Sequence, residues 1–224
     1  MHEPGESVLK RASAGIIGDL IARRPELVSC REAIERAAYV LARAFARGGK
    51  LLACGNGGSA ADAEHVAGEL MKSFRLPRPL PPDLQGRLAQ AGDPSLARRL
   101  QIALPAVALA GASPLSTAIA NDLGAEYCFA QQIMGLGRPG DVFLGISTSG
   151  NARNVLAAAR TARALGLRTL GLTGRAGGLL AGLVEVSIMV PADETFIVQE
   201  LHQPVYHALC AAVEEEIFGP AGTA

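Results

Sequence analysis

The chain has 224 residues, of which 49% are hydrophobic and 19% are charged. A chain of this length and composition can bury a large core and is too apolar to remain disordered. Lys+Arg and Asp+Glu number 21 each, so the formal net charge is zero, and this balance argues against nucleic acid or an anionic membrane as the partner.

The cysteines and the N-terminus indicate the compartment. Cys30, Cys54, Cys128 and Cys210 form no C-x-x-C pair, which is typical of reduced thiols in a cytosolic protein. The first residues have neither the basic start nor the apolar run of a signal peptide. No stretch approaches the roughly 18 apolar residues of a membrane span. We therefore expect a cytoplasmic protein.

Two amphipathic helices are expected at the start of the chain, over residues 7–24 and 25–48. Their apolar residues recur at helical spacing, and Pro25 suits the first turn of the second helix. We interpret residues 1–48 as N-terminal helices that belong to the same domain and to an oligomer interface. The main domain is then expected over residues 49–219.

Beyond residue 49, short apolar runs alternate with helical patterns. Continuous apolar strands that alternate with helices are typical of a parallel sheet covered on both faces. The sequence therefore predicts an α/β fold with a doubly wound parallel sheet of the flavodoxin-like type. Strands are expected at 50–54, 105–109, 141–146, 169–174 and 184–190, and helices at 60–72, 116–122, 152–165 and 194–217.

Residues 73–104 interrupt this alternation. The stretch 76–82 contains four prolines, which exclude a helix or a central strand there. Asp93-Pro94-Ser95 is typical of the start of a short helix. We interpret the segment as a surface insertion, and two roles remain open: a lid over the site, or a flap that packs against another subunit.

The loop Ser147-Thr148-Ser149-Gly150-Asn151 lies between a predicted strand and a predicted helix. Three adjacent hydroxyl groups, an unrestricted glycine and the first N–H groups of the helix can together hold a phosphate. The helix dipole favours such an anion without a lysine or arginine. An ordinary helix cap needs only one hydroxyl, so we predict that this loop binds the phosphate of a substrate.

A second loop, Gly55-Asn56-Gly57-Gly58-Ser59, follows the first predicted strand. It matches neither G-x-G-x-x-G nor the Walker A sequence, so it is a weak signal by itself. Its position matters more, because ligands of parallel sheets bind beyond the carboxyl ends of the strands. Both loops are predicted at that edge.

The helix after this loop contains His65 and Glu69, which are four residues apart and share one face. Such a pair can bind a divalent metal or act as a base with its orienting partner, and it can also be an incidental ion pair on a solvated face.

The last helix contains two of the four histidines, His202 and His207, on either side of Pro204. A spacing of five residues places the two histidines on different faces. We interpret His202, Tyr206 and Cys210 as core residues, and Pro204 predicts a local kink or a lost hydrogen bond.

The chain contains an ordered set of motifs: Gly55 to Asp62, His65-x-x-x-Glu69, Asn121-Asp122, Ile146 to Asn151, and Gln199-Glu200-x-His202 with His207. Taken together, these motifs resemble the sugar-isomerase (SIS) domain family, and within it the phosphoheptose isomerases, over residues 50–217. The resemblance implies conversion of sedoheptulose 7-phosphate to D-glycero-D-manno-heptose 7-phosphate, which feeds nucleotide-activated heptose synthesis. It also implies a homotetramer with active sites at subunit interfaces and one bound Zn²⁺ per site.

The resemblance also implies residue roles. Glu69 is expected to be the catalytic base and His207 the acid. Ala152 stands where the family commonly has serine, so one phosphate hydroxyl is missing. The expected metal ligands are His65, Glu69, Gln199 and His207. The expected substrate-binding residues are Asn56, Gly57, Ser59, Asn121, Asp122, Ser147, Thr148, Ser149, Asn151, Thr195 and Gln199.

Helix geometry constrains this ligand set. Gln199 and His207 are eight residues apart, which is roughly 12 Å along a straight helix and about 80° around it. Either Pro204 bends the helix strongly or the two side chains come from different subunits. We favour the second arrangement and expect the metal between His65 and His207 of neighbouring chains.

Two non-catalytic functions remain as alternatives. One is a regulator of the same fold that binds the bacterial replication initiator, and the other is a sugar-phosphate sensor with an intact phosphate loop. Neither needs acid–base residues, whereas Glu69 and His207 are both present. The isomerase is therefore favoured, and a different substrate such as a hexose phosphate stays open within it.

Overall fold

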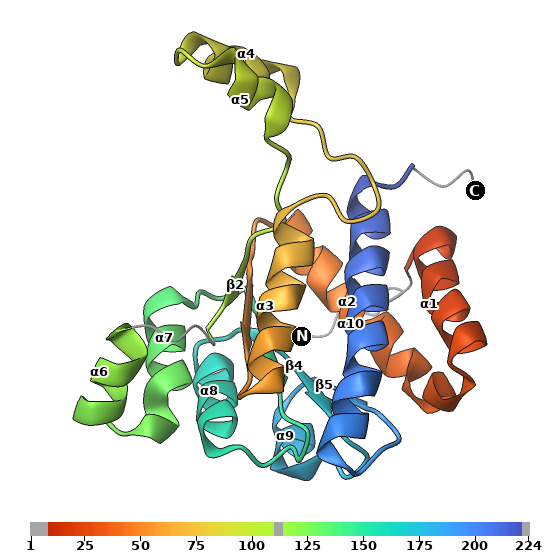
Figure 1. Ribbon diagram of the computed structural model, residues 1–224, viewed down its shortest axis with the longest axis vertical. Helices are drawn as coiled ribbons and strands as arrows, with labels where there is room; N and C mark the ends of the chain where they lie inside the picture. The colour runs from red at the N-terminus through yellow and green to blue at the C-terminus, as the bar shows by residue number, and fades with distance from the viewer. Residues whose placement is uncertain (1–8, 110–113, 221–224) are drawn as a thin grey trace.

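The structure is a computed structural model that describes residues 9–109 and 114–220 (Figure 1). Within this part of the chain, five parallel strands form one sheet in the order β2-β1-β3-β4-β5. This is the flavodoxin-like order, so the predicted fold is confirmed. The strands are β1 (Leu51–Cys54), β2 (Ala106–Ala108), β3 (Val142–Ile146), β4 (Arg168–Thr173) and β5 (Val186–Met189), and each overlaps its predicted range.

Helices cover both faces of the sheet (Figure 1). One face carries α1 (Arg11–Arg23), α2 (Arg31–Ala46), α3 (Gly58–Met71) and α10 (Thr195–Phe218), and the other carries α7 (Cys128–Leu136), α8 (Arg153–Ala164) and α9 (Gly178–Leu183). Two 3₁₀ segments, η1 (Pro25–Cys30) and η2 (Ala125–Tyr127), precede α2 and α7, and α6 (Pro114–Asp122) lies beside η2. Among the described residues, no helix is long and apolar enough to cross a membrane.

The strands are apolar throughout because both faces of the sheet are covered. Successive side chains of a strand point to opposite faces. In β1, Leu51 and Ala53 therefore join the core beneath α2, α3 and α10, while Leu52 and Cys54 join the core beneath α7, α8 and α9. All four residues are buried, which explains why the sequence shows continuous apolar runs rather than alternation.

The strand order places two connections beside each other. The chain leaves β1 through α3 on one face and leaves the neighbouring β3 through α8 on the other face. The crevice between such diverging connections is where open parallel sheets bind ligands. The loops that we selected from the sequence, at residues 55–59 and 147–151, are the two that flank this crevice, and residues 58 and 59 belong to the first turn of α3.

The inserted segment forms a helical hairpin of α4 (Pro82–Gln90) and α5 (Pro94–Arg99) that projects beyond the C-terminal end of α3 (Figure 1). The predicted short helix is confirmed as α5, whose start is capped by Asp93 accepting the N–H of Ser95. All residues of α4 and α5 are at least partly exposed. The hairpin extends away from the loops at the carboxyl edge of the sheet, so it does not cover them in this chain.

A buried ion pair anchors the base of this insertion. Arg78 and Glu214 have fully buried side chains that meet at 2.7 Å. The Glu214 carboxylate also accepts the backbone N–H groups of residues 74–76, and Arg78 donates to the carbonyl of Leu70. One carboxylate of α10 thus fixes where the chain leaves α3.

We expect Glu214→Gln to lower the free energy of unfolding by about 3–5 kcal/mol, because it removes the charge that faces the buried Arg78. Urea denaturation at pH 7 measures this loss. Asp83→Asn, which removes the charge from an exposed i,i+4 pair with Arg87, is the control and is expected to cost less than about 0.5 kcal/mol.

The stability difference between wild type and Glu214→Gln should also depend on pH. Burial raises the pKa of Glu214, but hydrogen bonds from residues 74–76 and Arg78 outweigh it and hold the pKa below its usual value. A lowered pKa gives stability above the unfolded pKa, and this stability is lost as the pH falls through the folded one. The difference between wild type and Glu214→Gln should therefore shrink on acidification, and a constant difference would contradict this account.

Candidate active site and metal centre

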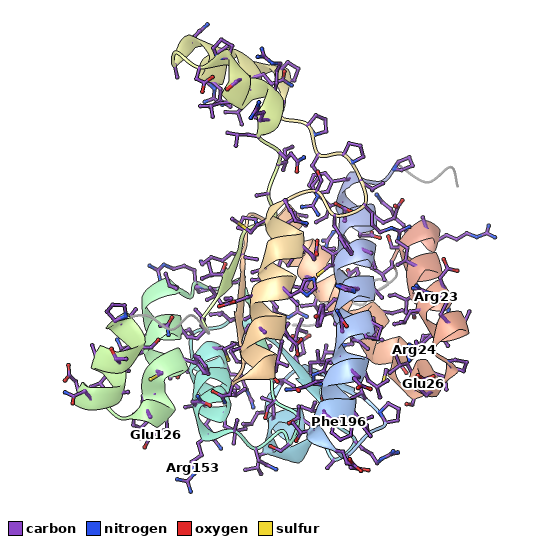
Figure 2. The ribbon with its side chains drawn as sticks, in the orientation of Figure 1. Arg23, Arg24, Glu26, Glu126, Arg153 and Phe196 are labelled. Carbon is purple, nitrogen blue, oxygen red and sulfur yellow. The ribbon has the colours of Figure 1, made fainter. Side chains whose placement is uncertain are left out.

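The two loops selected from the sequence meet through a pair of side-chain amides. Asn56 donates to Oδ1 of Asn154 at 2.9 Å, and Asn154 donates back to Oδ1 of Asn56 at 2.8 Å. Asn154 lies in the first turn of α8 and was not among the predicted site residues. Figure 2 shows Glu126, Arg153 and Phe196 along this edge of the molecule, and Arg23 and Arg24 on the side of α1.

The loop after β3 is a tight turn in which the N–H of Gly150 donates to the carbonyl of Ser147 at 2.9 Å. Gly150 has a φ of +66°, and a Cβ there would lie 2.0 Å from the carbonyl oxygen of Gly177, so only glycine fits. Ser147 is buried, Thr148 is half-buried and Ser149 is exposed. The three hydroxyl groups thus lie at different depths of the crevice.

Asn151 has a structural task in this loop. Its side chain donates to the carbonyl of Ser149 at 3.0 Å and accepts the N–H of Leu179 at 3.0 Å. The amide therefore ties the loop to the first turn of α9. This contact supports the loop and uses the groups that we expected to contact substrate.

The loop after β1 brings Gln199 to the same edge. A Cβ on Gly58 would lie 2.5 Å from Nε2 of Gln199, so the glycine permits α10 to approach the start of α3. Ser59 is buried beside it, and Gly57 has a φ of +56°. Thr195 is exposed at the first residue of α10, which starts at this edge.

His65, Glu69 and His207 converge where α3 and α10 pack side by side (Figure 1). Nε2 of His65 lies 3.2 Å from Oε1 of Glu69 and 3.2 Å from Nε2 of His207. The ligand atoms of the three residues all lie within 4.8 Å of one another. Imidazole nitrogen and carboxylate oxygen are zinc ligands, and three protein ligands leave a fourth position open. The donor set therefore fits Zn²⁺.

One expectation about this cluster is wrong. His65 and His207 belong to the same chain, so neighbouring chains are not needed to bring them together. α3 and α10 start at the same edge and run in the same direction, which allows side chains from the middle of each helix to meet. α10 continues unbroken through Pro204, and Gln199 stays two turns away, beside Gly58.

Charged neighbours favour the metal-binding forms of the ligands. Burial raises the pKa of Glu69, but Lys72 and His65 outweigh it and the pKa is lowered. Burial, with the charge of His65, lowers the pKa of His207. A carboxylate and a neutral imidazole are the forms that bind metal. His202, by contrast, is fully buried and its pKa falls to about 4 through burial, so it is the core residue that we predicted.

Three side chains beside the cluster carry a polar or stacking contact that the sequence did not reveal. The hydroxyl of Tyr206 lies 3.1 Å from Nδ1 of His65, although Tyr206 was assigned to the core alone. Burial and the nearby charge of Asp62 raise the pKa of that hydroxyl. The ring of Phe74, at the start of the insertion, lies 5.8 Å from the ring of His207. The spacing of Asp62, three residues before His65, was the one available signal.

The predicted pair Asn121 and Asp122 lies apart from the cluster, at the exposed end of α6, where Asn121 donates to Asp122 at 2.8 Å. The neighbouring η2 lines a shallow cavity of about 320 Å³ together with Asn56 and Ala152. A larger open groove of about 770 Å³, between α1 and α10, exposes His207. The histidine can thus be reached from the α1 side.

The comparisons with known proteins identify the family of the chain. The family model for the SIS domain matches residues 25–91 and 87–174, beginning earlier than the predicted domain start at residue 49. The chain belongs to the SIS domain family, among the phosphoheptose isomerases. The phosphoheptose isomerase of Roseiflexus sp. is 38% identical over 218 residues, covering 97% of this chain and 99% of its own length.

Two further members support the assignment. The phosphoheptose isomerase of Geotalea daltonii is 45% identical over 180 residues, covering 80% of this chain and 82% of its own. The solved structure of a phosphoheptose isomerase from Neisseria gonorrhoeae superposes with a TM-score of 0.70 at 34% identity, covering 92% of this chain and 98% of that chain.

The departure at Ala152 gives a testable consequence for this SIS domain. Ala152 is the N-cap of α8 and makes no side-chain capping hydrogen bond. Ala152→Ser is expected to raise the free energy of unfolding by about 1 kcal/mol, because serine caps a free N–H group. The added hydroxyl should also tighten binding of inorganic phosphate about fivefold. Urea denaturation and calorimetric titration measure the two effects.

Ala157→Ser, in the interior of the same helix, is the matched control for this substitution. There the hydroxyl caps nothing, so stability should fall slightly and phosphate binding should stay unchanged. Equal changes in the two variants would show that the loop 147–152 does not use position 152.

Proposed function

We propose that the protein is an aldose–ketose isomerase that converts sedoheptulose 7-phosphate to D-glycero-D-manno-heptose 7-phosphate. The observation that carries this proposal is the convergence of His65, Glu69 and His207 within one chain. This convergence occurs in a sequence similar to proteins named phosphoheptose isomerase.

The substrate's phosphate is assigned to the loop Ser147–Asn151. The hydroxyl groups of this loop and the first N–H groups of α8 provide donors, and the helix dipole favours the dianion. Asn56, Ser59 and Thr195 are proposed to contact the sugar from the same edge, and Asn121 and Asp122 from the side of η2.

The reaction moves one proton between neighbouring carbons. Glu69, held as a carboxylate, removes a proton from C1 of the ketose, and the electron pair forms the C1–C2 enediolate. The same carboxyl group returns the proton to C2, while His207 transfers a proton between the two oxygens, so no atom is gained or lost. A zinc ion held by His65, Glu69 and His207 would supply a Lewis acid for the developing oxyanion.

We expect the purified protein to form the aldose from sedoheptulose 7-phosphate, and Glu69→Gln to lower kcat by about 10²–10⁴-fold while substrate binding is retained. Glu64→Gln makes the same change at an exposed position one residue before His65 and should leave kcat unchanged. Activity should fall with a chelator and return with zinc. Coupled assay of the aldose and calorimetric titration measure the two properties.

The outcomes separate the functions that were left open. A wild-type protein that forms no aldose, with or without added zinc, is not this isomerase. If it nevertheless binds the sugar phosphate, and Glu69→Gln binds it equally, a sensor is favoured. Binding to the replication initiator without turnover would favour the regulator.

We also propose that the active enzyme is a homotetramer whose sites lie at subunit interfaces. Ser59 and Glu69 are ten residues apart on α3, which separates the phosphate loops from the cluster by roughly 15 Å along the helix. A second subunit that docks in the open groove beside α1 could bring its own loops and Gln199 to His207. Gln199 of that subunit is then the proposed fourth metal ligand.

Mixed oligomers test this arrangement. Glu69→Gln disables the cluster, and the double variant Thr148→Ala/Ser149→Ala disables the loop. If each site combines two chains, co-refolding the inactive proteins should restore about a quarter of wild-type activity. If each site lies within one chain, none returns. Sedimentation should give a particle four times the 23.1 kDa chain, and a monomer with full activity would contradict the proposal.

We place the enzyme in the cytoplasm. Cys30, Cys54, Cys128 and Cys210 are all free thiols, and such thiols are typical of a reducing compartment.

A further inference from the structure

The open groove between α1 and α10 carries an excess of positive charge. It has a volume of about 770 Å³ and exposes His207 of the cluster. Three arginines line it, Arg23, Arg24 and Arg75, whereas Asp19 is the one carboxylate among the described residues of the lining. Because the whole chain has a formal net charge of zero, this groove is a local basic site rather than part of a generally basic surface.

Two of the arginines have a structural explanation. Arg23 and Arg24 lie at the end of α1 (Figure 2), where a positive charge interacts favourably with the helix dipole. Nε of Arg23 donates to the carbonyl of Asp19 at 3.2 Å, and Nη1 of Arg24 lies 3.5 Å from Oε1 of Glu26. An exposed pair of this kind contributes little to stability, so Arg24 remains available to another anion.

Arg75 has no such explanation. It follows Met71, the last residue of α3, by four positions, which is beyond the reach of the helix dipole. Its backbone N–H donates to the buried carboxylate of Glu214 at 2.7 Å, and this contact fixes the chain at that point. The exposed guanidinium has no hydrogen-bond or ion-pair partner among residues 9–109 and 114–220. The fold thus holds an unpaired cation at the groove that exposes His207.

A second copy of the chain in this groove would need an anion between the two chains. Covering the groove removes water from the arginines, and a guanidinium that loses its water is destabilising unless an anion pairs with it. The loop Ser147–Asn151 contains no carboxylate, lysine or arginine. The anion that fits is therefore the phosphate that this loop is predicted to bind, and the arginines supply the positive charge that the loop lacks.

We propose that Arg75, assisted by Arg24, binds the same phosphate group as the loop Ser147–Asn151 of a second copy of the chain. This inference rests on the subunit arrangement of the proposed function. The loops of the same chain are too distant, because the 14 residues of α3 separate them from Arg75 by about 20 Å. A sugar phosphate held in this way bridges two subunits, and its other end lies in the groove that exposes His207.

The test is the binding of inorganic phosphate to the metal-free protein, measured by calorimetric titration. Arg75→Gln should weaken this binding about 10- to 100-fold, because it removes a charge-assisted hydrogen bond. Arg75→Lys keeps the charge without the planar fork and should lose less. Arg47→Gln is the matched control, at an exposed arginine where α2 ends, four residues before β1. It should bind phosphate like wild type.

Mixed oligomers show whether two chains share the phosphate. Arg75→Gln and the double variant Thr148→Ala/Ser149→Ala each remove a different half of the site. Co-refolding equal amounts should restore about a quarter of the tight phosphate sites if the halves come from different chains, and none if both lie in one chain. A ligand that bridges two chains also stabilises the oligomer. Phosphate should therefore shift the sedimentation of dilute wild-type protein towards the larger particle, but not that of Arg75→Gln.

The outcomes separate this inference from the proposed function. If Arg75→Gln binds phosphate like wild type, or if co-refolding restores no sites, the inference is overturned and the isomerase remains. If wild-type protein binds no phosphate, both the inference and the assignment of the loop are overturned. If phosphate binding changes as expected in a protein that forms no aldose, the inference is supported and the isomerase is overturned. Arg24→Gln should weaken phosphate binding in the same direction, and it carries the test if Arg75→Gln does not fold.

Discussion

The site depends on the register with which α3 packs against α10. Both helices start at the carboxyl edge of the sheet and run in the same direction (Figure 1). Gln199 against Gly58 fixes their relative height at one end, and the buried Arg78–Glu214 pair fixes it at the other. A shift of one residue moves a side chain about 1.5 Å along a helix and 100° around it. Such a shift in either helix would remove a histidine from the cluster.

This register also links the insertion to the chemistry. Glu214 accepts the backbone N–H of Phe74, just after the end of α3. The ring of Phe74 lies 5.8 Å from the ring of His207. The hairpin α4–α5 projects beyond this anchored base. The base of the insertion is therefore anchored beside the cluster, while its own helices remain largely exposed. Of the two roles left open by the sequence, a flap against another subunit agrees better with this geometry than a lid over the chain's own loops.

What the sequence predicted, and what it did not, follows from the range of the interactions involved. The strands were predictable because burial on both faces makes every residue apolar, and His65 with Glu69 because four residues make one helical turn. The short α9 escaped notice because three of the residues from Gly177 to Leu183 are glycines. Tyr206 was assigned to the core because its partner, His65, is 141 residues away, and no local pattern reports such a contact. The assumption that His65 and His207 needed two chains failed for the same reason.

The lengths of α3 and α10 impose a further constraint, because these helices separate the loops at their start from the cluster of His65, Glu69 and His207 further along. The phosphate loops and Gln199 lie where α3 and α10 begin, whereas Glu69 and His207 lie about two to three turns further along the same helices. Pro204 does not shorten this distance, because α10 stays continuous. His207 faces an open groove on the side of α1 rather than the crevice between the loops. This difference in height is the reason for our proposal that a second copy of the chain completes the site by placing its loops beside the first copy's cluster. Oligomerisation would then be a geometric requirement of the chemistry.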